Sequence, residues 1–179
     1  MDYYVFVDNS NLWIEGQFAS AVAKSFARNM SDAHERNVND STWRVDFGKL
    51  LELVVEGHVA DIKTAMLFGS KPPDNDSLWN MAKHSGFEVD CKPRNFSNKE
   101  KAVDTGMVQR IDKCLYRQAK EGDTFVIVAG DRDFAPSVYA IKEEKMSAVV
   151  AFWDNAANEL KLATDVFINL TEKVNYIKY

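Results

Sequence analysis

The chain has 179 residues, of which 46% are apolar and 27% are charged, as expected for one soluble globular domain. No apolar run is long enough to span a bilayer and the N-terminus does not resemble a secretory signal, so we expect a cytoplasmic protein without membrane contacts. The net charge of −5 argues against non-specific coating of nucleic acid. Cys91 and Cys114 lack metal-type spacing and are expected to be reduced thiols.

Strands are predicted where short apolar, β-branched runs are bounded by turn residues, at 3–7, 61–68, 87–91, 125–129 and 148–152, with a shorter run at 166–170. Helices are predicted at 12–28, 47–56, 77–85, 103–120, from Pro136 to about Lys145, and at 155–164. The polar segment 29–45 has little periodicity and is interpreted as a surface loop or insertion. This alternation predicts one α/β domain over 1–179, a three-layer α/β/α sandwich with a central parallel sheet.

Four aspartates fall at the carboxyl ends of the predicted strands or just after the loops that follow them. Asp8 follows the first strand, Asp131 and Asp133 follow the strand at 125–129, and Asp104 begins the helix at 103–120. Parallel strands end at one edge of the sheet, where carboxylates repel one another unless a cation binds between them. Mg²⁺ and Mn²⁺ prefer oxygen ligands, so the pattern indicates metal-dependent hydrolysis of a phosphodiester.

Each of these aspartates also has a purely structural interpretation. Asp104 and Asp133 could cap the helices that follow them, and Asp8 with Asn11 could shape the first turn, in which an Asn or Ser would cap the first helix. Asp131 comes directly at the strand end, which makes it a better metal ligand than Asp133.

A basic loop over 92–101 supplies candidates for nucleic-acid contacts. Its cations are expected to contact a phosphate backbone or, alternatively, to be solvated: Lys92, Arg94, Lys99 and Lys101. Phe96 is the best candidate for stacking on a base, whereas the four tryptophans are interpreted as core or surface anchors. The three histidines, which lack metal-ligand spacing, are predicted to be surface or helix-end residues: His34, His58 and His84.

Four stretches together resemble a known family. They are V-F-V-D-N-S-N-L at 5–12, K-A-V-D at 101–104, D-T-F-V-I-V-A-G-D-R-D-F-A-P at 123–136 and N-E-L-K-L-A-T-D-V-F-I-N-L at 158–170. They are similar in order and spacing to the motifs of NYN domains, the LabA/DUF88 branch of the PIN-like nuclease superfamily. Ala102 replaces the usual glycine of the second motif, which affects the loop but leaves the acid in place.

The resemblance implies a sheet of order 3-2-1-4-5 and a ribonuclease that depends on Mg²⁺ or Mn²⁺. Asp8, Asp104 and Asp131 would then bind the metal. Asp133 and Asn11 would support them, and Asp112 would do so with less weight. Asp112 lies eight residues beyond Asp104, about 12 Å along a helix, so one ion cannot bind both directly. A solvated surface charge is the alternative for Asp112.

We therefore expect an endoribonuclease that uses an activated water, since no arrangement for covalent catalysis occurs in the sequence. Lys101, Arg94 and Arg132 would contact the RNA. An RNA- or protein-binding module without catalysis is the alternative. A phosphatase of the haloacid dehalogenase type is disfavoured because its second acid, two residues after Asp8, is missing. The cleavage mode, the RNA and the oligomeric state, including a homodimer, are left open.

Overall fold

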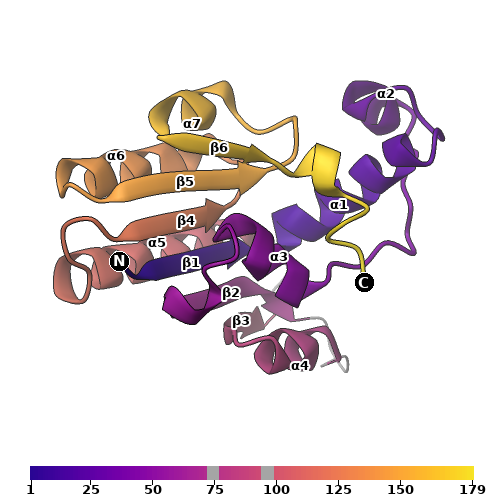
Figure 1. Ribbon diagram of the computed structural model, residues 1–179. Helices are drawn as coiled ribbons and strands as arrows, with labels where there is room; N and C mark the ends of the chain where they lie inside the picture. The colour runs from indigo at the N-terminus through magenta and orange to yellow at the C-terminus, as the bar shows by residue number, and fades with distance from the viewer. Residues whose placement is uncertain (72–76, 94–98) are drawn as a thin grey trace.

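The computed structural model describes residues 1–71, 77–93 and 99–179, without the side chains of residues 71, 92, 93 and 99–104. Its centre is a six-stranded parallel sheet of order β3-β2-β1-β4-β5-β6 (Figure 1). The strands are β1 Tyr3–Asp8, β2 Ile62–Lys71, β3 Glu88–Pro93, β4 Thr124–Val128, β5 Ser147–Phe152 and β6 Val166–Asn169. The predicted α/β class and strand order are confirmed, and the short β6 extends the sheet beyond β5.

Helices cover both faces of this sheet and make it the middle layer of a sandwich (Figure 1). They are α1 Asn9–Ala23, α2 Met30–Glu35, α3 Phe47–Val54, α4 Ser77–His84, α5 Lys99–Arg117, α6 Ala135–Glu143 and α7 Asn158–Ala163, with short 3-10 turns η1 Val59–Asp61, η2 Arg132–Phe134 and η3 Leu170–Lys173. Within the ranges that the structure describes, no helix is both long and apolar enough to cross a membrane.

The central strand β1 supplies both hydrophobic cores, because its side chains alternate between the two faces. Tyr3, Val5 and Val7 pack with residues of α1, α3 and α4. Tyr4 and Phe6 pack with residues of α5, α6 and α7. Every residue of β1 is buried, which explains why the strand is a nearly continuous apolar run. The same burial fixes its register and therefore the place where it ends.

The prediction of an irregular loop across 29–45 is wrong for its first part, which forms α2. The Asn29 side chain accepts a hydrogen bond of 2.8 Å from the backbone N–H of Asp32 and caps this helix. Asp32 is buried, and guanidinium nitrogens of Arg28 and Arg36 each lie 3.1 Å from one of its carboxylate oxygens. Because polar pairs stabilise this short helix, a periodic pattern of apolar residues could not have predicted it. The preceding helix ends at Ala23 rather than at residue 28, and Ser25 adopts a left-handed φ of 61°.

Candidate active site at the carboxyl edge of the sheet

Asp8 is held in place by the helix that follows it. It is the last residue of β1, and its side chain is 5% exposed. Its Oδ1 accepts hydrogen bonds from the backbone N–H groups of Ser10 at 3.1 Å and Asn11 at 3.3 Å. The cap of α1 is therefore Asp8 itself, and the prediction that an Asn or Ser of this turn caps the helix is wrong. The carboxylate of Asp8 thus lies at the positive end of the α1 dipole.

Asp131 lies at the same edge of the sheet, after the neighbouring strand. β1 and β4 pair in parallel, with Val7 opposite Val128. The Nδ2 of Asn11 donates a hydrogen bond of 2.8 Å to Oδ2 of Asp131. Asp131 is exposed to solvent, whereas Asp8 is buried. The structure thus brings Asp8, Asn11 and Asp131 to the ends of two adjacent strands, with the asparagine tying the first turn of α1 to the residue after Gly130.

Gly130 sets the backbone from which Asp131 projects. A Cβ atom at this position would lie 2.2 Å from Cε1 of Phe152, so no larger residue fits without a shift of the ring. The carbonyl oxygen of Gly130 accepts a hydrogen bond of 2.9 Å from the backbone N–H of Ala157. Close packing against β5, rather than an unusual backbone angle, is therefore the reason for glycine at this strand end.

Asp133 and Arg132 lie in η2, just beyond Asp131, and both side chains are exposed. The predicted capping alternative for Asp133 is wrong, because Phe134 occupies the N-cap position of α6 and no side-chain hydrogen bond caps that helix. Phe134 is fully buried and anchors the turn. Exposure leaves Asp133 and Arg132 facing solvent on the rim of the same edge.

The remaining acids belong to α5. This helix begins at Lys99, so Asp104 lies inside it, and the alternative in which Asp104 caps the helix is wrong. The side chain of Asp104 is outside the described residues. Asp112 is half-buried two turns further along. No group of three or more potential metal ligands occurs among the described residues. Metal binding by Asp8, Asp104 and Asp131 therefore stays a prediction.

The structure does not describe most of the side chains that were predicted to contact RNA. The side chains of Lys92, Lys99 and Lys101, and the whole of Arg94 and Phe96, lie outside the described residues. The three histidines are exposed, as predicted, and each has a polar neighbour: Glu15 at 2.8 Å for His34, Asp61 at 3.4 Å for His58, and the carbonyl oxygen of Asn80 at 2.6 Å for His84. None of these contacts involves the aspartates of the sheet edge.

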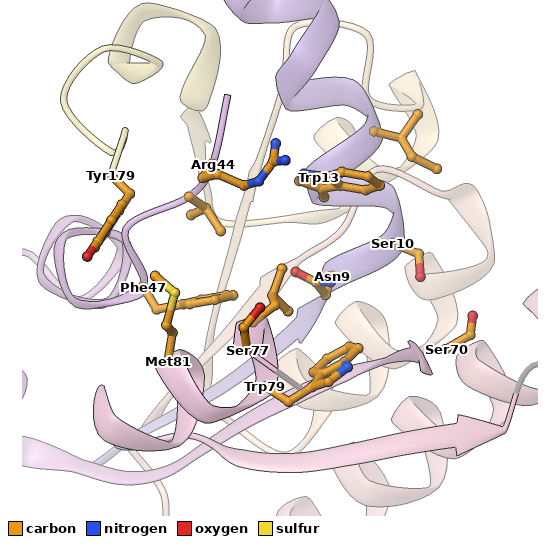
Figure 2. Close-up of a pocket in the computed structure, with 13 residues that line it drawn as sticks. Asn9, Ser10, Trp13, Arg44, Phe47, Ser70, Ser77, Trp79, Met81 and Tyr179 are labelled. Carbon is orange, nitrogen blue, oxygen red and sulfur yellow. The ribbon is translucent and has the colours of Figure 1, made fainter. Parts of the chain in front are cut away.

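A pocket beside Asp8 was not predicted. It has a volume of about 530 Å³, and Asn9 and Ser10, the two residues after Asp8, form part of its wall (Figure 2). Trp13 also lines it, whereas Trp43 and Trp153 are core residues, as expected. The sequence carried one signal of this pocket, a tryptophan only five residues after a strand-end aspartate.

Comparisons with known proteins agree with this fold. The chain is similar in structure to a protein of unknown function from Vibrio parahaemolyticus, with a TM-score of 0.65 and 16% sequence identity over 94% of this chain and 92% of that chain. This likeness shows the fold alone. No match was found among curated proteins. A family model, the NYN domain, matches residues 3–171. The chain therefore belongs to the NYN domain family, within the PIN-like nuclease superfamily.

Proposed function

We propose that the chain is a metal-dependent ribonuclease that hydrolyses RNA phosphodiester bonds internally with an activated water. The observation that carries the proposal is the link from Asn11 to Asp131 beside the buried Asp8, at the ends of two adjacent parallel strands. Ligands of α/β proteins bind at this edge. Membership of the NYN family supports a nuclease.

The side chains at this edge suit Mg²⁺ or Mn²⁺, because carboxylate and amide oxygens are the donors that these ions prefer. Asp8 and Asp131 would hold the ion, with Asp104 as a third ligand. The ion would lower the pKa of a water molecule and stabilise the departing oxygen. The α1 cap holds one oxygen of Asp8 in a fixed position, and the Asn11 amide orients one oxygen of Asp131. Arg132 would contact the RNA phosphate from the rim.

The proposal is tested by incubating the purified chain with single-stranded and structured RNA in the presence of Mn²⁺ or Mg²⁺. Asp8→Asn and Asp131→Asn should each lower the cleavage rate by at least about 100-fold, because each removes a charged ligand. Asp154→Asn is the matched control. Asp154 follows β5 at the same edge, is exposed, and should tolerate the change. A covalently closed circular RNA, which has no ends, tests the internal mode of cleavage.

An RNA- or protein-binding module without catalysis would give a different set of results. The chain would not cleave RNA, or cleavage would persist equally in Asp131→Asn. Equal cleavage in that variant would indicate a contaminating nuclease. Calorimetric titration with Mn²⁺ separates the two cases further. We expect heat of binding in the unaltered chain and in Asp154→Asn, and weaker binding in Asp131→Asn. Equal Mn²⁺ affinity in all three proteins would contradict the proposed metal site.

A further inference from the structure

The pocket beside Asp8 lies on the face of the sheet that α1, α3 and α4 cover (Figure 2). Its volume of about 530 Å³ falls in the range of small-molecule sites, roughly 300–1,000 Å³. Ser70, the second-last residue of β2, also lines the pocket. Since Asn9 and Ser10 directly follow Asp8, this pocket and the candidate active site share one short stretch of chain.

Two polar atoms of the pocket wall are buried without a partner among the described residues. The Oδ1 of Asn9 and the Nε1 of Trp13 are shielded from solvent, and neither makes a hydrogen bond within the described part of the chain. Asn9 is 6% exposed, and Figure 2 shows its amide oxygen turned toward the other lining side chains. Buried polar groups are normally paired. Asn9 and Trp13 therefore leave one acceptor and one donor unpaired beside the pocket, which a ligand with a donor and an acceptor of its own would pair if these side chains turn toward it.

The rest of the described wall combines aromatic, aliphatic and serine side chains with the positive charge of Arg44. Phe47 and Trp79 supply apolar surface, and Trp79 packs on Gly69, where a Cβ atom would come within 2.7 Å of its ring. The guanidinium of Arg44 lies 5.8 Å from the centre of the Trp13 ring. Its Nη1 donates to the carbonyl oxygens of Ser41 at 2.8 Å and Trp43 at 2.7 Å, which hold it there.

This combination matches the chemistry of a nucleotide. A planar base has a π-face for aromatic side chains and donors and acceptors along its edge, and its phosphate is attracted to an arginine. We propose that the pocket binds one unpaired nucleobase of the RNA and so selects the nucleotide beside the cleaved bond. The inference rests on the proposed function and adds to it the source of base preference. It also gives Trp13 and Trp79 a binding role beyond that of anchors.

The test measures binding of the four ribonucleoside 5′-monophosphates to the full chain by tryptophan fluorescence and calorimetry, with EDTA present. At least one nucleotide should bind at least about tenfold more tightly than ribose 5-phosphate, which lacks a base. Trp13→Phe keeps a ring and removes the N–H, and it should weaken binding about tenfold, as loss of one buried hydrogen bond would. Asn9→Leu should do the same. Tyr139→Phe, an exposed site on α6, is the matched control.

Three results would overturn the inference: no nucleotide binding, equal binding of ribose 5-phosphate, or unchanged affinity in both Trp13→Phe and Asn9→Leu. If Asn9→Leu fails to fold, Trp13→Phe alone decides, with its melting temperature as the check. Preferential binding of peptides over all four nucleotides would indicate a protein partner and would also contradict it.

The two proposals can fail separately. Nucleotide binding that depends on Trp13 in a chain that cleaves no RNA would refute the nuclease and keep the base pocket. Cleavage that depends on Asp131, with the same rate and base preference in Trp13→Phe, would refute the base pocket and keep the nuclease.

Discussion

Asn11 donates a hydrogen bond of 2.8 Å to Asp131 across 120 residues of sequence, and this contact joins the first turn of α1 to the end of β4. We expect Asn11→Ala to lower RNA cleavage by about 10- to 100-fold, the usual cost of removing a group that orients a metal ligand. Because the contact is exposed, the free energy of unfolding should change by less than about 1 kcal/mol. Cleavage rates and urea unfolding of the same preparations measure both quantities.

A matched control for Asn11→Ala is Asn175→Ala, an exposed site that follows η3. Asn11→Asp is informative as well, because it replaces the amide donor with a second negative charge facing Asp131. It should impair cleavage more than Asn11→Ala does, and added Mn²⁺ should restore part of the loss. Full activity in Asn11→Ala would show that the link does not orient Asp131.

Gly130→Ala should destabilise the chain by about 1–3 kcal/mol, the range for overpacking a core, since the new methyl group meets the Phe152 ring. It should also lower cleavage, because the shift moves Asp131. Urea unfolding measures the first effect. In a Phe152→Leu background the ring is gone, so the same substitution should cost less. Additive costs in the double variant would mean that the methyl group and the ring do not compete for space.

Asp32 should make stability depend on pH in the acid range. Hydrogen bonds from the backbone and guanidinium of Arg28, and from Arg36, lower the pKa of Asp32 from 3.8 to about 2. The unfolded chain therefore binds the proton first as the pH falls. The stabilisation is complete above the unfolded pKa and is lost as the pH falls toward the folded value. We expect the difference in unfolding free energy between the unaltered chain and Asp32→Asn to shrink between about pH 5 and pH 2.

The Arg28→Met background supplies the control for this prediction. It removes the guanidinium but keeps the backbone N–H that also bonds Asp32. The effect of Asp32→Asn should then vary less with pH than it does in the presence of Arg28. If the difference in unfolding free energy between the unaltered chain and Asp32→Asn stays constant from pH 5 to pH 2, the Asp32 carboxylate is not stabilised in the folded chain.

The parallel sheet could be predicted because its strands are buried on both faces and therefore appear as continuous apolar runs, as in 125–129. The place of Asp8 and Asp131 at one edge followed from the topology. The α2 helix could not be predicted, since the polar pairs around Asp32 hold it. The pocket could not be predicted either, because Trp13, Arg44 and Trp79 come from three separate segments that only the packed fold brings together.

Gly69→Ala tests whether the pocket depends on the packing of Trp79 against Gly69. The new methyl group would come within 2.7 Å of Cη2 of Trp79, a buried ring on α4 that must then move. Since the ring lines the pocket, we expect weaker nucleotide binding together with a loss of about 1–3 kcal/mol in unfolding free energy. Fluorescence titration with the best-binding nucleotide and urea unfolding provide the two measurements.

Gly48→Ala is the matched control for this substitution. Its methyl group would meet only Oδ1 of Asp46, at 3.4 Å, and it lies on the exposed side of α3, where alanine favours the helix by about 1 kcal/mol over glycine. This variant should bind nucleotide normally and be as stable as the unaltered chain or more so. If Gly69→Ala loses stability but keeps full nucleotide affinity, Trp79 packs on Gly69 but does not contribute to binding of the base. Trp13 and Asn9 must then account for the recognition without Trp79.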